Sequence, residues 1–178
     1  KLNGADFTDT TFSAVTNALN VAKTVAGNVN AKQSEINSAK EALDNAVNGL
    51  VNISALKASV KTAEDANYVQ ADYSEASWEV YANALQTAKD VIAKGNATAT
   101  EIADATKALN DAMNDLTTDK SELQSIIATV ESANYQQEDF TQASYTEFKT
   151  ALENAKNVNT NQNAKQSEIN NAKEALEN

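Results

Sequence analysis

The sequence predicts an all-α protein of tandem three-helix bundles stacked end to end into an elongated rod. Helix breakers are scarce, because the 178 residues include no proline and only four glycines. No stretch alternates apolar and polar residues with the period of two that a half-buried strand requires. Apolar residues instead recur at helical spacing, and that pattern is itself repeated along the chain.

The repeat is most evident in two nearly identical segments. NAKQSEINSAKEAL, residues 30–43, returns as NAKQSEINNAKEAL, residues 163–176. A second pattern recurs around Phe12, Trp78 and Tyr145, which lie 66 and 67 residues apart. We therefore predict a unit of three helices. The predicted domains are a partial repeat with its second and third helices (1–52), a complete repeat (53–118) and a repeat with a truncated last helix (119–178).

Each helix of the unit carries one apolar stripe. The stripes of the first helices are Leu56, Val60, Ala63 and Leu123, Ile127, Val130. The second helix of the complete repeat has Trp78, Tyr81, Leu85, Ala88 and Ile92. The third helices have Ile36, Ala39, Leu43, Ala46, Leu50 and Ile102, Ala105, Leu109, Ala112, Leu116. This spacing is typical of helices packed nearly parallel or antiparallel, and the alanines allow close approach.

Capping residues predict where the second helices begin. Thr8, Ser74 and Thr141 are the expected N-caps, with hydroxyls that accept from the amides of Thr11, Ser77 and Ser144. An aromatic residue precedes each cap and another follows four positions after it. The pairs Phe7–Phe12, Tyr73–Trp78 and Phe140–Tyr145 are therefore predicted to form hydrophobic staples.

The third helices have their own signals. Asn30 with Gln33, and Asn163 with Gln166, fit a capping box with asparagine as N-cap. Asp119 with Glu122 resembles the same device at a first helix. Gly49 is expected to end a third helix as the residue after its C-cap.

The first repeat lacks its first helix in this sequence. Its hairpin would expose an apolar stripe unless the first helix of the next repeat closes it. Bundles could be divided with the first helix at the start or at the end of each unit, and the sequence leaves both divisions open.

Composition excludes several functions. Histidine, cysteine and arginine are absent, so imidazole bases, thiolate nucleophiles, ordinary zinc sites and guanidinium clamps are excluded. The net charge of −11 opposes binding to nucleic acid or to an anionic membrane surface. No stretch is long and apolar enough for membrane insertion. We therefore expect no enzyme activity and no cofactor.

Residues 72–92 and 96–116, with an aromatic–Ser/Thr start, a following AL..AK and a closing AL..A...L, resemble the FIVAR module. The resemblance recurs three times and covers nearly the whole chain. It implies a three-helix unit found in Gram-positive surface proteins and secreted enzymes. Tandem arrays resemble the repeats of giant staphylococcal extracellular-matrix-binding adhesins, which form rods and are credited with fibronectin binding. The resemblance implies no catalytic residue and no defined matrix-contact residue.

Several residues are candidates for ligand binding or catalysis. Trp78 could stack on a sugar, but its staple position favours a core role. Tyr68 and Tyr135 lie in turns and are better ligand candidates, although packing over helix ends is the favoured interpretation. The acidic pairs Glu64/Asp65 and Glu138/Asp139 have no positioned partner in the sequence and are interpreted as solvated surface.

Three turn features were weighed as well. The turn NTNQN, residues 159–163, lacks the acidic ligands of a calcium loop. The sequons at Asn52 and Asn96 are interpreted as chance matches in a bacterial protein.

Three functions remain open. The repeats could form a structural stalk at a bacterial cell surface, attached to the cell wall as part of a longer chain. They could bind host matrix such as fibronectin. They could also be an accessory spacer in a secreted carbohydrate-active enzyme. Neighbouring repeats are the expected partners in all three.

Overall fold

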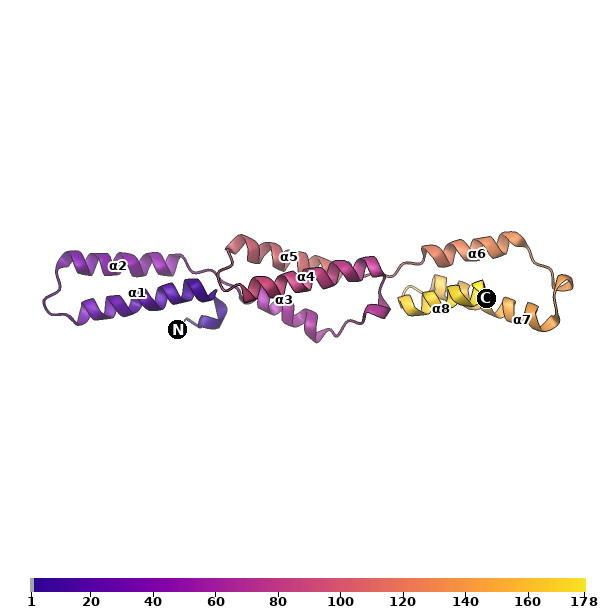
Figure 1. The fold of residues 1–178 in the computed structure, drawn as a ribbon, viewed down its shortest axis with the longest axis horizontal. Helices are drawn as coiled ribbons and strands as arrows, with labels where there is room; N and C mark the ends of the chain where they lie inside the picture. Colours follow the sequence, from indigo (N-terminus) through magenta and orange to yellow (C-terminus); the bar gives the residue numbers. More distant parts are fainter. Residues whose placement is uncertain (1) are drawn as a thin grey trace. The chain divides into compact units, whose positions relative to one another are not determined.

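The computed structural model describes residues 2–178, and its regular elements in that range are helices (Figure 1). The α-helices are α1 (Asp9–Gly27), α2 (Gln33–Asn48), α3 (Ser54–Asp65), α4 (Glu75–Ala93), α5 (Ala99–Asn114), α6 (Ser121–Ala133), α7 (Gln142–Thr160) and α8 (Gln166–Glu177). Short 3-10 helices η1 (Gly4–Asp6), η2 (Gln70–Asp72) and η3 (Gln137–Asp139) precede α1, α4 and α7. The all-α prediction is confirmed.

The chain divides into two compact units, and the division falls inside α4. Unit 1 comprises Lys1–Ala66 and Ala82–Met113, and unit 2 comprises Asn67–Tyr81 and Asn114–Asn178. Each unit is described below by itself.

In unit 2, the helices α6, α7 and α8 pack on one another around a single core. Each helix contributes from its predicted stripe. The buried members are Leu123 and Ile127 from α6, Leu152 and Ala155 from α7, and Ile169 and Ala172 from α8, with Ala164 from the preceding turn. Two of the helical positions are alanine, so the helices approach closely without large side chains between them.

In unit 1, α1 and α2 pack on each other as an antiparallel hairpin (Figure 1). Val15 and Ala39 are buried between them. Leu19 and Ile36 remain exposed, and Leu43 is half-buried. We call these three residues the hairpin stripe.

The exposed fractions of three equivalent isoleucines show that the hairpin has no third helix over its apolar stripe. Ile36 is 43% exposed, whereas Ile102 and Ile169 are 6% and 2% exposed. In unit 1, the stripe of α3 is buried at Leu56, Val60 and Ala63, so α3 has no apolar face left for the hairpin. An ion pair of 2.8 Å between Lys89 Nζ and Glu64 Oε1 joins α3 to α4 instead. The hairpin stripe is therefore left open, as predicted if the first helix of the next repeat does not close it.

The second helices begin where the sequence predicts. Thr8 and Thr141 are the N-caps of α1 and α7, and α4 begins directly after Ser74. The amides of Ser77 and Ser144 donate to the hydroxyls of Ser74 and Thr141 at 3.4 and 3.2 Å. Thr8 differs, because its hydroxyl bonds the hydroxyl of Thr11 at 2.8 Å.

The aromatic staples form in all three repeats. Ring centroids are 6.4 Å apart for Phe7–Phe12, 6.4 Å for Tyr73–Trp78 and 6.5 Å for Phe140–Tyr145, and each pair is stacked. A stack that recurs in this way fixes the angle at which the chain enters each second helix.

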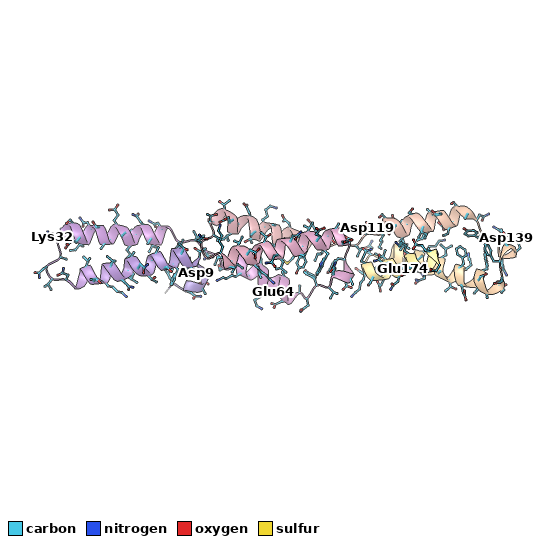
Figure 2. All side chains as sticks on the ribbon, viewed as in Figure 1. Asp9, Lys32, Glu64, Asp119, Asp139 and Glu174 are labelled. Carbon is cyan, nitrogen blue, oxygen red and sulfur yellow. The ribbon has the colours of Figure 1, made fainter. Side chains whose placement is uncertain are left out.

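The predicted asparagine caps of the third helices are wrong. Lys32 and Lys165 are the N-caps of α2 and α8, and Lys32 is labelled in Figure 2. A lysine side chain has no acceptor, so only half of a capping box forms. Glu35 and Glu168 accept from the Lys32 and Lys165 amides at 2.8 and 2.9 Å.

Asn30 and Asn163 lie in the turns that precede these helices, each two residues before the N-cap lysine. Their amides donate to the side chains of Asn28 and Asn161, each at 3.0 Å. Asparagine therefore stabilises the turn, and glutamate stabilises the helix start.

Two further end signals are also corrected. Asp119 does not pair with Glu122 as a box; its carboxylate accepts from the Ser121 amide at 2.8 Å. Gly49 follows the last residue of α2 as expected, but its φ of −86° is not left-handed. The left-handed positions are Asn67, Asn134 and Gly95.

The third helix of the middle repeat has the full capping box. The Glu101 amide donates to the Thr98 hydroxyl at 3.2 Å, and Glu101 Oε2 accepts from the Thr98 amide at 2.7 Å. Glu101 Oε1 also pairs with Lys94 Nζ at 2.5 Å. The hydrogen bond from Lys94, with those from Thr98, lowers the pKa of Glu101 to about 2.

The difference in burial between the equivalent Ile169 and Ile36 predicts a difference in how much their substitution destabilises the chain. Ile169→Ala should lower the free energy of unfolding by about 2–5 kcal/mol, because it opens a cavity in the unit 2 core. The matched Ile36→Ala should cost below about 1 kcal/mol, because its side chain is already solvated. Urea unfolding of both variants checks this, and equal costs would contradict the difference in burial.

The Glu101 cap predicts a pH dependence. Its folded pKa of about 2 lies below the ordinary 4.5, so its stabilisation is present above pH 4.5 and is lost as pH falls toward 2. Glu101→Gln should reduce the slope of unfolding free energy against pH in that window. Lys94→Gln should reduce this slope in part, because the substitution removes the main cause of the lowered pKa of Glu101. Unchanged slopes in urea titrations at several pH values would refute this assignment.

Candidate functional site

The best-formed polar arrangement in each unit is a joint between the start of a second helix and the segment after a third helix. In the first joint, the Thr8 amide donates to the Val51 carbonyl at 2.9 Å and the Val51 amide donates to the Thr11 hydroxyl at 3.3 Å. In the second joint, Ser74 and Ser77 make the same contacts with Thr117, at 2.8 and 3.3 Å. The two joints lie 66 residues apart and share one design.

The first joint extends to the following repeat. The Ile53 amide donates to the Asp6 carbonyl at 2.8 Å, and Lys57 Nζ donates to the Ala5 carbonyl at 2.8 Å. The amide of Thr10 donates to the carbonyl of Gly95 at 3.0 Å. Gly95 has a φ of +70°, and a Cβ there would also meet Asp9 at 3.4 Å. The start of one repeat and two segments of the next are thus joined by two backbone–backbone bonds and one lysine side chain.

The second joint carries lysines in addition. Lys165 Nζ pairs with Asp72 Oδ2 at 2.8 Å, and this contact raises the pKa of Lys165. Lys120 Nζ donates to the Val158, Asn159 and Asn161 carbonyls at 3.3, 2.9 and 2.6 Å. An ammonium at this place satisfies carbonyls at the end of α7 and opposes the negative end of its dipole.

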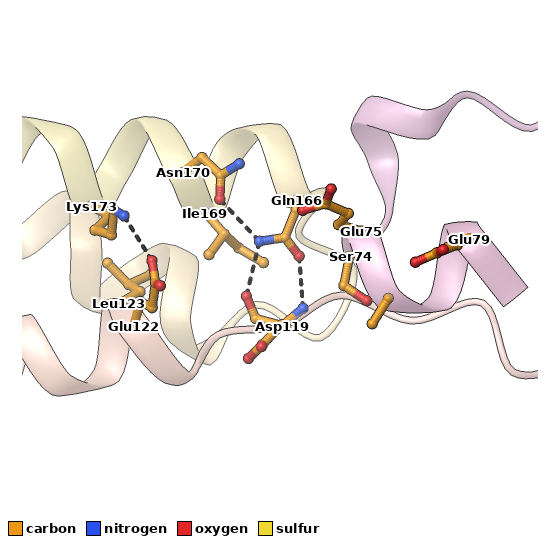
Figure 3. Close-up of a pocket in the computed structure, with 11 residues that line it drawn as sticks. Ser74, Glu75, Glu79, Asp119, Glu122, Leu123, Gln166, Ile169, Asn170 and Lys173 are labelled. Carbon is orange, nitrogen blue, oxygen red and sulfur yellow. Dashed lines mark hydrogen bonds and ion pairs between the residues drawn. The ribbon is translucent and has the colours of Figure 1, made fainter.

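A groove runs beside the second joint (Figure 3). Gln166 crosses its floor, accepting from the Asp119 amide at 2.7 Å and donating to the Asp119 carbonyl at 3.0 Å. Lys173 Nζ pairs with Glu122 at 2.7 Å. The remaining lining is Ser74, Glu75, Ala76, Glu79, Leu123, Ile169 and Asn170. The polar groups that Figure 3 joins by dashed lines therefore bind one another across the groove.

The aromatic candidates lie together at the joints of unit 2. Trp78 is half-buried, stacked on Tyr73 and 5.3 Å from Tyr81 between ring centroids. Tyr68 meets the edges of Tyr73 and Tyr81 at 5.8 and 5.4 Å. Burial, Tyr68 and Asp72 raise the pKa of Tyr73, and Lys165 opposes them. These rings contact one another, which supports packing over sugar binding.

The next repeat has the matching cluster. Tyr135 meets Phe140 and Phe148 edge-on, each at 5.6 Å. The Tyr145 hydroxyl donates to the Tyr135 carbonyl at 3.4 Å. Tyr135 and Phe140 are each 46% exposed, so this cluster presents more aromatic surface than the first.

The acidic candidates are spread over the surface. Glu64 pairs with Lys89 at 2.8 Å and Asp65 with Lys61 at 2.7 Å, so the expectation that no partner accompanies this pair is wrong. Both carboxylates are more than half exposed. Glu138 and Asp139 are exposed in η3, at the end of unit 2 where Figure 2 labels Asp139.

The turn candidates make local contacts. Asn52 accepts from the amide and hydroxyl of Ser54 at 2.9 and 2.6 Å, and Asn96 is exposed between α4 and α5. Within residues 2–178, no three histidine, cysteine or acidic side chains are grouped to hold a metal ion. No helix in that range combines the length and apolarity needed to cross a membrane.

Sequence reasoning missed the joints. Their acceptors are largely backbone carbonyls, which leave no residue signature. The signal that could have found them is the hydroxyl pair three residues apart, Thr8/Thr11 and Ser74/Ser77, in which the second hydroxyl has a partner about 40 residues later.

Two known proteins resemble this chain, one over almost its whole length and the other over more than half of it. A polysaccharide lyase 8 family protein, HylA, of Enterococcus faecalis is 30% identical over 96% of the chain, which spans 13% of that protein. A zinc metalloprotease, ZmpB, of Streptococcus pneumoniae is 35% identical over 59% of the chain, which spans 5% of that protein. The chain thus matches only a small part of these relatives. No solved structure matches it.

The model of the FIVAR domain matches residues 1–51, 52–117 and 119–178. These three matches cover almost every residue, and each contains the aromatic staple and the hydroxyl cap of a second helix. The chain belongs to the FIVAR domain family.

Proposed function

We propose that this chain is a non-catalytic spacer, in which three repeats, 1–52, 53–118 and 119–178, stack end to end into an elongated rod. The observation that carries the proposal is the recurring joint. Thr8 with Val51 in the first repeat, and Ser74 with Thr117 in the second, make the same backbone bond within each repeat, and this bond holds the segment that leads into the next repeat. Further contacts cross to the next repeat: the Ile53 amide donates to the Asp6 carbonyl at 2.8 Å, and Lys165 Nζ pairs with Asp72 at 2.8 Å. Such nearest-neighbour contacts support an ordered array.

The joints are suited to fixing the direction of one repeat relative to the next. Each combines a backbone bond, a hydroxyl bond and an aromatic stack. Contacts of three kinds around one segment restrict rotation about it more than a flexible linker does. The shared core of α6, α7 and α8 supports dividing the array with the first helix at the start of each unit.

The relatives support a spacer inside a larger protein. The chain spans 13% and 5% of a polysaccharide lyase and a zinc metalloprotease, so FIVAR repeats accompany enzymes of different chemistry. A segment shared by such different enzymes is better suited to positioning than to catalysis. The lyase favours the accessory spacer of a secreted carbohydrate-active enzyme, and the cell-wall-attached adhesin stalk is the second candidate.

Both candidates place the chain outside the bacterial cell. A net charge of −11 spread over the helix surfaces keeps such repeats soluble and discourages their association with one another. The residues that flank the array distinguish the candidates, because a catalytic domain and a wall-attachment signal are different sequences.

The rod makes a prediction for scattering in solution. Helices of 19 residues are about 28 Å long at 1.5 Å per residue, so three stacked units should give a radius of gyration of about 25 Å. A single compact globule of this length should give about 16 Å. Small-angle scattering measures the radius directly, and a value near the second figure would rule out the rod.

Matrix binding is tested separately. Titration of the chain onto immobilised fibronectin should show no saturable binding if the repeats act only as a spacer. A variant with several exposed lysines and glutamates exchanged serves as the control for surface charge. Saturable binding that the control loses would instead establish the adhesin function.

A further inference from the structure

We propose that Asn3 is a site of spontaneous covalent modification, at which the backbone nitrogen of Gly4 attacks the carboxamide and converts Asn3 to aspartate or isoaspartate. The reaction consumes water and needs no enzyme. The inference is independent of the spacer function, because it concerns the chemistry of one asparagine in the segment that supplies carbonyls to the first joint.

The reaction replaces an amide nitrogen by an oxygen from water. The Gly4 nitrogen loses its proton and bonds to Cγ of Asn3, which closes a five-membered succinimide ring. Nδ2 leaves with that proton as ammonia. Water then opens the ring at one of its two carbonyls: cleavage of the new bond at Cγ leaves aspartate, and cleavage of the original peptide bond leaves isoaspartate, in which the main chain runs through the side chain.

A glycine after asparagine favours this ring closure, because the attacking nitrogen is uncrowded and the backbone can rotate to bring it to Cγ. The sequence contains the pair twice, at Asn3–Gly4 and at Asn48–Gly49. Both asparagines are exposed. Exposure therefore does not distinguish the two sites, and the backbone around them does.

The second pair is held by a helix. Asn48 is the last residue of α2, and the amide of Gly49 donates to the carbonyl of Asn45 at 3.0 Å. This hydrogen bond keeps the proton on the nitrogen that would attack, and the helical backbone keeps that nitrogen from turning toward Cγ. Asn48 should therefore react only when the end of α2 opens.

The backbone of the first pair is not helical at its asparagine. Asn3 has an extended backbone, with φ of −97° and ψ of 117°, and precedes the short helix η1. The amide of Gly4 donates to no acceptor among residues 2–178. Within those residues, no hydrogen bond has to break before this nitrogen attacks.

The carboxamide of Asn3 is held loosely. Its Oδ1 accepts from the Ala5 amide and its Nδ2 donates to Asp6 Oδ1, each at 3.3 Å. Both distances are longer than usual for an N–H···O bond, and both contacts are exposed. The Ala5 amide also points at the oxygen on which negative charge develops as the ring closes, which favours the attack.

The equivalent positions show that this place in the repeat is open even after a complete first helix. Val69 and Gln136 are the N-caps of η2 and η3, as Asn3 is of η1. Val69 is 56% exposed, and Gln136 is exposed as well. Valine has no carboxamide, and glutamine would have to close a larger ring. The first repeat is therefore the one of the three with a reactive residue here.

The glycine of the pair is required by packing. A Cβ at Gly4 would meet Cε1 of Phe12 at 2.7 Å, so a larger residue would displace the ring that stacks on Phe7. Isoaspartate at position 3 adds one main-chain atom before Gly4. The modified chain should therefore shift Gly4 against the aromatic staple.

Both products also change the charge beside the first joint. A carboxylate at position 3 faces Asp6 where Nδ2 was a donor, so repulsion replaces a hydrogen bond. The carbonyl of Asp6 accepts from the Ile53 amide, and that of Ala5 accepts from Lys57 Nζ, each at 2.8 Å. Displacement of η1 weakens these contacts, so the modification should loosen the first joint.

Peptide mapping by mass spectrometry, after incubation of the whole chain at mildly alkaline pH, tests the site. In the folded chain, Asn3 should be converted about tenfold or more faster than Asn48, because α2 must open before Asn48 reacts. In urea the two should react at similar rates. Asn3→Gln is the matched control and should abolish conversion at position 3 while leaving that of Asn48 unchanged.

Two outcomes of this experiment overturn the proposal. Equal rates at Asn3 and Asn48 in the folded chain would show that the backbone does not select the site. Conversion of Asn3 in urea but not in the folded chain would show that the native structure protects it.

Hydrogen exchange tests the effect on the joint. The modified chain carries one more negative charge and separates from the unmodified chain by anion exchange. The amide of Ile53 should exchange about threefold or more faster in the modified chain, because its acceptor on Asp6 is displaced. The Ser74 amide, which donates to Thr117 in the second joint, is the internal control and should be unchanged. Unchanged exchange at Ile53 would contradict the loosening of the first joint.

Discussion

Every helix of this chain carries one apolar stripe, and a stripe of this kind is buried only when two other helices cover it. The core of α6, α7 and α8 meets this constraint, and Leu123, Ile169 and Ala172 belong to its single buried cluster. The α1–α2 hairpin does not meet it, and Ile36 remains in contact with solvent. In the hairpin, Val15 and Ala39 are buried between two helices, whereas full burial of the position of Ile36 requires a third, as at Ile169.

The joints follow from the same constraint. Because each helix is only a few turns long, its end groups are a large share of its backbone polar groups, and those groups need partners. The chain satisfies them with the next segment: Thr8 and Ser74 donate to carbonyls about 40 residues later. These contacts hold the segment that leads out of each repeat, and the bond from the Ile53 amide to the Asp6 carbonyl crosses from the first repeat to the second.

Much of the fold could be predicted from side-chain patterns. The second helices begin at Thr8, Ser74 and Thr141 because hydroxyl caps and aromatic staples are short-range features that a sequence displays directly. The third helices were placed correctly but their caps were not. Asn30 lies two residues before the observed N-cap, because the bond from the Lys32 amide to Glu35 sets the helix start.

The candidate sites were less predictable. The joints rest on backbone carbonyls such as those of Val51 and Thr117, which no residue type reveals. The partners of Glu64 and Asp65 depend on which lysines lie nearby in space, and Lys89 comes from another helix.

The most direct test of the central constraint compares two helices of almost the same sequence in one molecule. Amide hydrogen exchange of α2 and α8 measures their protection without any substitution. The account predicts much slower exchange in α8, around Ile169 and Ala172, than at Ile36 and Ala39 in α2. Equal protection of the two helices would contradict it, because burial by a third helix would then make no difference to their stability.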